Sequence, residues 1–113
     1  MQDFKKLYAW QKSHRLVLRV YELSATLPKA EIYGLTAQIR RAAVSIPANI
    51  AEGACRGGKP FAQFLKVSLG SAGELEYYAI LLADLQLISQ STSEKLQSDV
   101  VEAKKSSRVC SSQ

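Results

Sequence analysis

Apolar residues recur along the whole chain at the three- and four-residue spacings of an amphipathic helix, and no segment alternates for long enough to predict a β-strand. The pattern is interrupted at Pro28, between Gly53 and Pro60, and in the serine-rich segment 89–93. Helices joined by such short connections pack antiparallel to their sequence neighbours. The sequence therefore predicts an all-α fold, an up-down-up-down left-handed four-helix bundle. Its helices are expected near residues 4–26, 32–53, 60–88 and 92–106.

Two residues define details of the predicted second helix. Pro47 lies inside it and removes one backbone hydrogen bond, but the apolar pattern stays in phase, so we expect a kink and not a break. Gly53 is a candidate left-handed residue at the end of this helix. Residues 107–113 are polar and serine-rich, and we expect them to fray. One domain is predicted, a bundle over residues 1–106 with a polar tail.

Three of the predicted helices carry a second apolar stripe besides the one expected to face the core. In the first helix, a stripe with Trp10, His14 and Tyr21 lies nearly opposite one with Leu16 and Val20. A helix in a small monomer needs one stripe, and exposed apolar patches usually mark interfaces, so we predict a homo-oligomer. The alternative is that the bundle itself buries both stripes of one or two helices. The predicted interface residues are Ala37, Val44, Ala51, Val67, Tyr78, Leu81 and Leu85.

The charge of the chain favours a polyanionic partner. Its 113 residues include 15 Lys and Arg and 10 Asp and Glu, a formal net charge of +5. The excess lies in residues 1–70, with eleven basic and four acidic residues. Such a surface attracts nucleic acid, although it also serves solubility. Exposed aromatic residues that would stack on bases are few, so we expect structured RNA to be bound through its phosphates. The candidate contacts are Lys12, Arg15, Arg19, Arg40, Arg41, Arg56 and Lys59.

The sequence offers little support for enzymatic or metal chemistry. The single histidine, His14, lies in an apolar stripe, which favours a buried or half-buried structural role. Cys55 and Cys110 are too few for a disulfide framework or a four-ligand metal site. We therefore expect no catalytic residues, no metal and no cofactor. The longest apolar run, residues 79–83, is too short to cross a membrane, and no secretory signal is visible, so we expect a cytoplasmic protein.

Three motifs resemble those of a known family. They are YGLTAQIRRAAVSIPANIAEG at residues 33–53, WQKSH at residues 10–14, and FAQFLKVSLGSAGELE at residues 61–76. They are similar to the small four-helix-bundle proteins encoded in intervening sequences of 23S ribosomal RNA genes, and the match covers residues 4–88. The resemblance implies an up-down-up-down bundle and, from related proteins, a five-fold ring, hence a homopentamer. A distant relative, the accessory variability determinant of diversity-generating retroelements, partners a reverse transcriptase and nucleic acid.

Two functions remain open. The first is a non-enzymatic oligomeric bundle that binds RNA or DNA, most simply structured RNA, through basic surface residues. The alternative is a structural ring scaffold that binds a protein partner and has no direct role with nucleic acid. The two differ in whether the basic residues gather on one surface.

Overall fold

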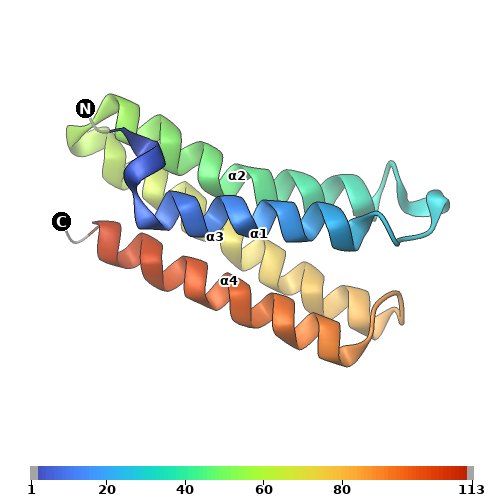
Figure 1. Cartoon of the computed structure of the whole chain (residues 1–113). Coiled ribbons are helices and arrows are strands. Elements are labelled where there is room, and N and C mark those ends of the chain that lie inside the picture. Colours follow the sequence, from blue (N-terminus) through green and yellow to red (C-terminus); the bar gives the residue numbers. More distant parts are fainter. Residues whose placement is uncertain (1–2, 112–113) are drawn as a thin grey trace.

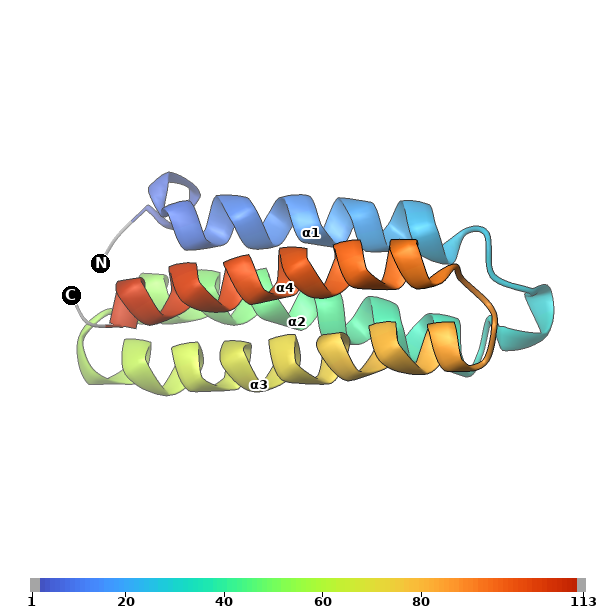
Figure 2. The ribbon, with the colours of Figure 1, turned by 90° about the horizontal axis from the view of Figure 1, so that it is seen from below.

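The computed structural model describes residues 3–111 and consists of four α-helices in one antiparallel bundle (Figure 1). The helices are α1 (Tyr8–Ser24), α2 (Leu35–Arg56), α3 (Gly58–Asp84) and α4 (Gln90–Ser111); the short 3-10 helices η1 (Phe4–Lys6) and η2 (Lys29–Glu31) precede α1 and α2. The start of α1, the α2–α3 turn and the end of α4 lie at the same end of the bundle (Figure 2). The bundle measures 43 × 24 × 19 Å. The predicted all-α four-helix bundle is confirmed.

One face of each helix forms the core. α1, α2 and α3 contribute large aliphatic side chains, whereas α4 packs largely through small residues. The Ser93 hydroxyl of α4 is fully buried and donates to the Ala79 carbonyl at 2.6 Å, which satisfies both polar groups. The large aliphatic side chains with less than 2% exposure are Leu16, Val20, Ile39, Ile46, Ile50, Leu65, Leu75, Leu82 and Val100.

α4 is longer than the sequence predicts. It ends at Ser111 and not near residue 106, so residues 107–111 of the expected frayed tail are helical, while 112–113 lie outside the described residues. Ser107 is only 1% exposed, and Cys110 packs against the core. Because serine is polar, the hydrophobic pattern does not reveal that this last turn is buried.

The end of α2 differs from the expectation at Gly53. The helix continues through Pro47 without interruption and passes Gly53. The left-handed residue that ends α2 is Gly57, with φ 69°, and its amide donates to the Gly53 carbonyl at 2.8 Å. A Cβ at Gly53 would lie 2.8 Å from Cδ1 of Phe61 and 2.9 Å from Cβ of Phe64. Gly53 therefore permits the close approach of α2 and α3 beside their one-residue connection.

Candidate functional site

The seven residues predicted to form a subunit interface all lie outside the buried core. On α2, Ala37 and Val44 are exposed and Ala51 is half-buried. On α3, Val67 and Leu85 are exposed, and the remaining two residues, Tyr78 and Leu81, are half-buried. The outer surfaces of two neighbouring helices thus carry apolar side chains that the bundle itself leaves exposed or only partly covered.

The outer stripe of α1 is also only partly covered. Trp10 is half-buried, and its ring stacks on the His14 imidazole with centroids 5.0 Å apart and an interplanar angle of 6°. His14 itself is exposed, which corrects the prediction of a buried or half-buried histidine. Trp10 packs against the core while His14 lies on the outer edge of the same stripe, so the imidazole covers one face of the Trp10 ring. Leu18 and Tyr21 of the same stripe are exposed as well.

A groove of about 560 Å³ joins the outer surfaces of α1 and α2, with Tyr21, Ala37 and Val44 among its lining residues. Two of the predicted RNA contacts, Arg40 and Arg41, also line this groove. The Arg40 guanidinium lies 4.6 Å from the centre of the Tyr21 ring, which is a cation–π contact. The Arg41 guanidinium donates a hydrogen bond to the side-chain oxygen of Gln38, one turn earlier in α2. These arginines therefore border the predicted apolar interface.

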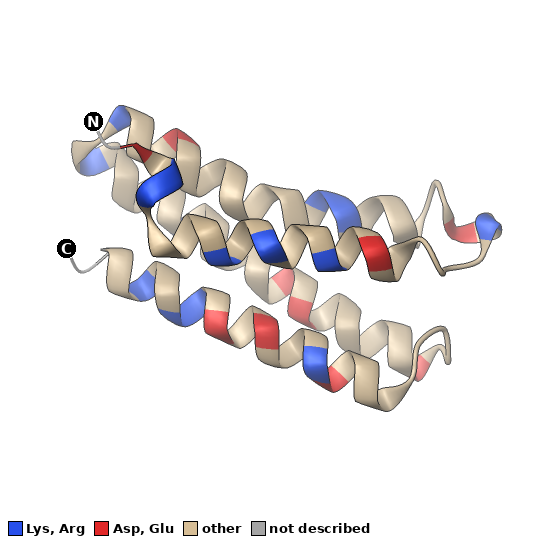
Figure 3. Cartoon of the chain, in the orientation of Figure 1, with Lys and Arg blue, Asp and Glu red and all other residues tan. Residues whose placement is uncertain are grey.

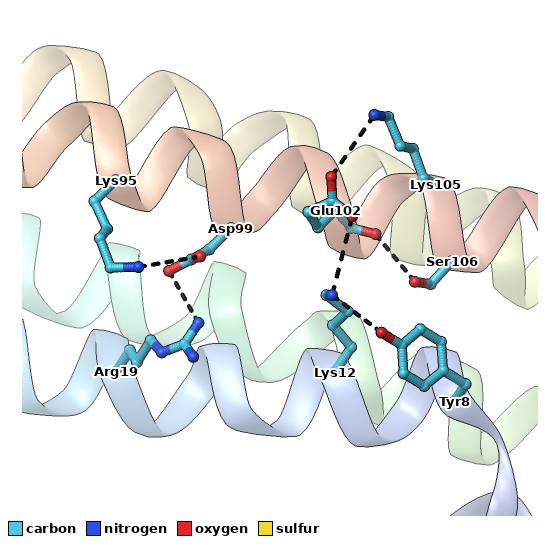
Figure 4. A network of polar contacts seen from close by, with 8 residues as sticks. All are labelled: Tyr8, Lys12, Arg19, Lys95, Asp99, Glu102, Lys105 and Ser106. Carbon is cyan, nitrogen blue, oxygen red and sulfur yellow. Dashed lines mark hydrogen bonds and ion pairs between the residues drawn. The ribbon is translucent and has the colours of Figure 1, made fainter.

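The basic ridge predicted on α1 is a row of ion pairs with α4 (Figure 4). Lys12 Nζ lies 4.0 Å from the Glu102 carboxylate, and the Arg19 guanidinium lies 3.0 Å from the Asp99 carboxylate. Arg15, between them, is exposed and makes no ion pair within the part of the chain that the structure describes. Carboxylates of α4 thus neutralise two of the three cations that the sequence assigns to RNA.

Charge is distributed unevenly along the long axis of the bundle (Figure 3). The half that contains the α2–α3 turn, here called the basic half, comprises residues 3–18, 45–70 and 100–111 and carries ten Lys and Arg against three Asp and Glu. The acidic half, residues 19–44 and 71–99, carries five against seven. The formal charges of the two halves are therefore +7 and −2.

The structure divides the predicted RNA contacts between these two halves. Lys12, Arg15, Arg56 and Lys59 lie in the basic half, and Arg19, Arg40 and Arg41 lie in the acidic half. The sequence prediction omitted the other cations of the basic half because it summed charge over segments of the chain and not over the two ends of the bundle. The antiparallel order of the predicted helices indicates which residues share one end, so it could have identified them. The missed residues are Lys5, Lys6, Lys66, Lys104, Lys105 and Arg108.

The two cysteines differ in exposure, which predicts different reactivity. Cys55 is exposed, whereas Cys110 is half-buried beside a cavity of about 250 Å³ between α4 and the start of α1. Burial raises the pKa of the Cys110 thiol. Because the thiolate is the nucleophile, we expect iodoacetamide to alkylate Cys110 several-fold more slowly than Cys55 near neutral pH, with the Cys110 rate rising as the pH is raised. Peptide mapping by mass spectrometry measures both rates, and equal rates would contradict the expectation.

Residues 3–111 were also compared with the geometry that a metal site and a membrane span require. This part of the chain contains no group of three or more His, Cys, Asp or Glu side chains placed to hold a metal ion. None of its helices is both long and apolar enough to cross a membrane. The features that the structure does present are apolar outer faces on α1, α2 and α3 and a basic surface at one end.

Comparison with known proteins finds one family and a similar solved structure. The family model described as 23S rRNA-intervening sequence protein matches residues 5–108, which includes most of α4. The solved structure is described as a protein of unknown function from the S23 ribosomal protein family of Bacteroides thetaiotaomicron VPI-5482. It is 26% identical with a TM-score of 0.85, and the match covers 93% of this chain and 96% of that chain. No curated protein matches the chain.

Proposed function

This chain belongs to the 23S rRNA-intervening sequence protein family, and from that premise we propose that it is a non-enzymatic, self-associating bundle protein that binds structured RNA through backbone phosphates. The observation that carries the proposal is the concentration of positive charge in the basic half. Within the described residues, four lysines of that half are exposed and make no ion pair: Lys5, Lys6, Lys59 and Lys66. Cations that no carboxylate neutralises are the groups that phosphates attract most strongly.

Self-association is supported by the apolar side chains that remain exposed on the outer faces of the bundle. Leu18 on α1, Val44 on α2, and Val67 and Leu85 on α3 are all exposed. Exposed apolar residues on the outer faces of helices are typical of protein interfaces. We propose a homo-oligomer that uses these faces. Its proposed number of subunits, five, comes from the five-fold ring that the family resemblance implies.

A titration against salt tests the RNA proposal. Fluorescence anisotropy of a labelled RNA hairpin is measured with the purified protein between about 50 and 300 mM NaCl. Each phosphate contact contributes about −0.7 to −0.9 to the slope of log affinity against log salt, so four contacts give a slope of about −3. Binding that is absent, or that does not respond to salt, would contradict the proposal.

A ring scaffold for a protein partner is the second candidate. The groove that contains Arg40 and Arg41 favours it, because apolar side chains beside guanidinium groups suit a partner surface that combines apolar and acidic residues. An oligomer that forms without any salt-dependent RNA binding is the result expected of the scaffold.

A further inference from the structure

Two segments that contain no Asp or Glu come together at one end of the bundle. The first, residues 53–73, covers the end of α2, the α2–α3 turn and the first half of α3. The second, residues 103–111, is the last part of α4. About 30 residues of sequence separate the segments, but α3 and α4 are packed neighbours. The cations that they contribute are Arg56, Lys59, Lys66, Lys104, Lys105 and Arg108.

The register of α3 against α4 places cations of the two helices at the same level along the bundle axis. It is given by the hydrogen bond from the Ser93 hydroxyl to the Ala79 carbonyl. Towards the basic end of the bundle, Ser106 lies 13 residues after Ser93 on α4, and Lys66 lies 13 residues before Ala79 on α3. Because both helices rise about 1.5 Å per residue, Lys66 is level with Ser106 and hence with the turn that carries Lys105.

Part of the charge in these segments is available to a ligand. Lys59 and Lys66 are exposed, make no ion pair within residues 3–111, and lie two helical turns apart on the same side of α3, about 10 Å along the axis. Lys105 is exposed, with a carboxylate oxygen of Glu102 at 3.7 Å. Lys104 is already engaged, since its Nζ lies 2.5 Å from the carboxylate of Glu76.

We infer that Lys59, Lys66, Lys105 and Arg108, here called the α3–α4 basic patch, bind the sugar-phosphate backbone of a nucleic-acid duplex. This inference rests on the proposed function, and it places nucleic-acid binding on the α3–α4 basic patch and not on the basic ridge of α1. With one phosphate per strand for about every 3.4 Å of duplex, the patch spans about three base pairs. One patch therefore binds weakly, and repetition of the patch in an oligomer raises the affinity.

A duplex fits this surface better than a single strand does. Single strands are held by aromatic side chains on which bases stack. The aromatic residues of the first segment, Phe61 and Phe64, are half-buried, and the Arg56 guanidinium lies 5.3 Å from the centre of the Phe64 ring. The second segment contains no aromatic residue. Binding is therefore by backbone phosphates, with little sequence preference.

A pair of charge-matched double variants tests the location. The patch variant is Lys66→Gln with Lys105→Gln, and the control is Lys29→Gln with Lys95→Gln. Each removes two exposed lysines, of which one is near a carboxylate (Lys105 at 3.7 Å, Lys95 at 3.9 Å) and one makes no ion pair in the described part of the chain. The probes are a labelled 16-base-pair RNA duplex, a DNA duplex of the same length, and a 16-nucleotide single strand. Thermal melting by circular dichroism verifies that both variants fold.

The patch variant is expected to bind both duplexes roughly tenfold more weakly, with a salt slope about 2 units shallower, while the control stays within about threefold of the wild type. Equal losses in the two variants would reduce the effect to net charge and overturn the patch. Wild-type binding that neither variant weakens, or that favours the single strand, would place the site elsewhere while the proposed function stands. No salt-dependent binding by the wild type to any probe would overturn both.

Discussion

Replacing Gly53 by valine is expected to lower the free energy of unfolding by about 1–3 kcal/mol, the usual cost of overpacking. A Cβ at this position would lie 2.8 Å from Cδ1 of Phe61, 2.9 Å from Cβ of Phe64 and 3.4 Å from Cα of Phe61. The Phe61 ring can rotate, but the Phe64 Cβ and the Phe61 Cα are fixed to the backbone of α3. The added side chain therefore forces α2 and α3 apart close to their shortest connection.

Gly70→Val is the matched control for this prediction. Gly70 also lies inside a helix, but a Cβ there meets nothing within 4 Å. Because valine is a slightly better helix former than glycine, this variant is expected to change the stability by less than about 0.5 kcal/mol. Urea unfolding followed by circular dichroism measures both variants at equal protein concentration. Similar stabilities of the two variants would show that the α2–α3 contact tolerates a side chain at residue 53.

The second large effect is expected for self-association. Val67→Glu places a carboxylate on the outer stripe of α3, where the wild-type side chain is apolar and 52% exposed. A charge buried in an interface without a partner costs about 3 kcal/mol or more, which corresponds to a loss of roughly a hundredfold in association. Light scattering coupled to size-exclusion chromatography is expected to find the wild type oligomeric and Val67→Glu monomeric at the same micromolar concentration.

Ile80→Glu is the control for Val67→Glu on the same helix. Ile80 is also β-branched and is 41% exposed, but it is not part of the predicted interface stripe. It is expected to leave the oligomer intact. Dissociation by both variants would mean that added negative charge, and not the position of Val67, disperses the assembly. A wild type that is monomeric would contradict self-association itself.

The hydrophobic pattern predicted the helices and their outer faces but not the full extent of α4. Every residue assigned to the interface lies outside the buried core, because the period of a helix determines which side chains share a face. The end of α4 was harder to delimit because it buries Ser107, a polar residue without hydrophobic signal. The burial of Ser107 depends on how closely α4 approaches its neighbours, which is a property of the packed bundle.

The charged surface could be predicted only in part. The excess of lysine and arginine is visible in the sequence, but the fate of each cation depends on the register between helices. Lys12 and Arg19 lie beside Glu102 and Asp99, which follow them by 90 and 80 positions in the sequence. No local pattern connects such distant residues. The same register brings Lys66 level with the turn that carries Lys105, which the sequence alone leaves far apart.

The single residue between α2 and α3 also has a consequence that we expect for the order of folding. Closing this pair requires the shortest loop of any two consecutive helices, so it loses the least conformational entropy, and α2 and α3 share the most extensive contact surface. The contact between α1 and α4 joins residues some 80 positions apart, and contacts of such long range form late. We therefore expect folding to start from a helical hairpin of α2 and α3, onto which α1 and α4 dock afterwards.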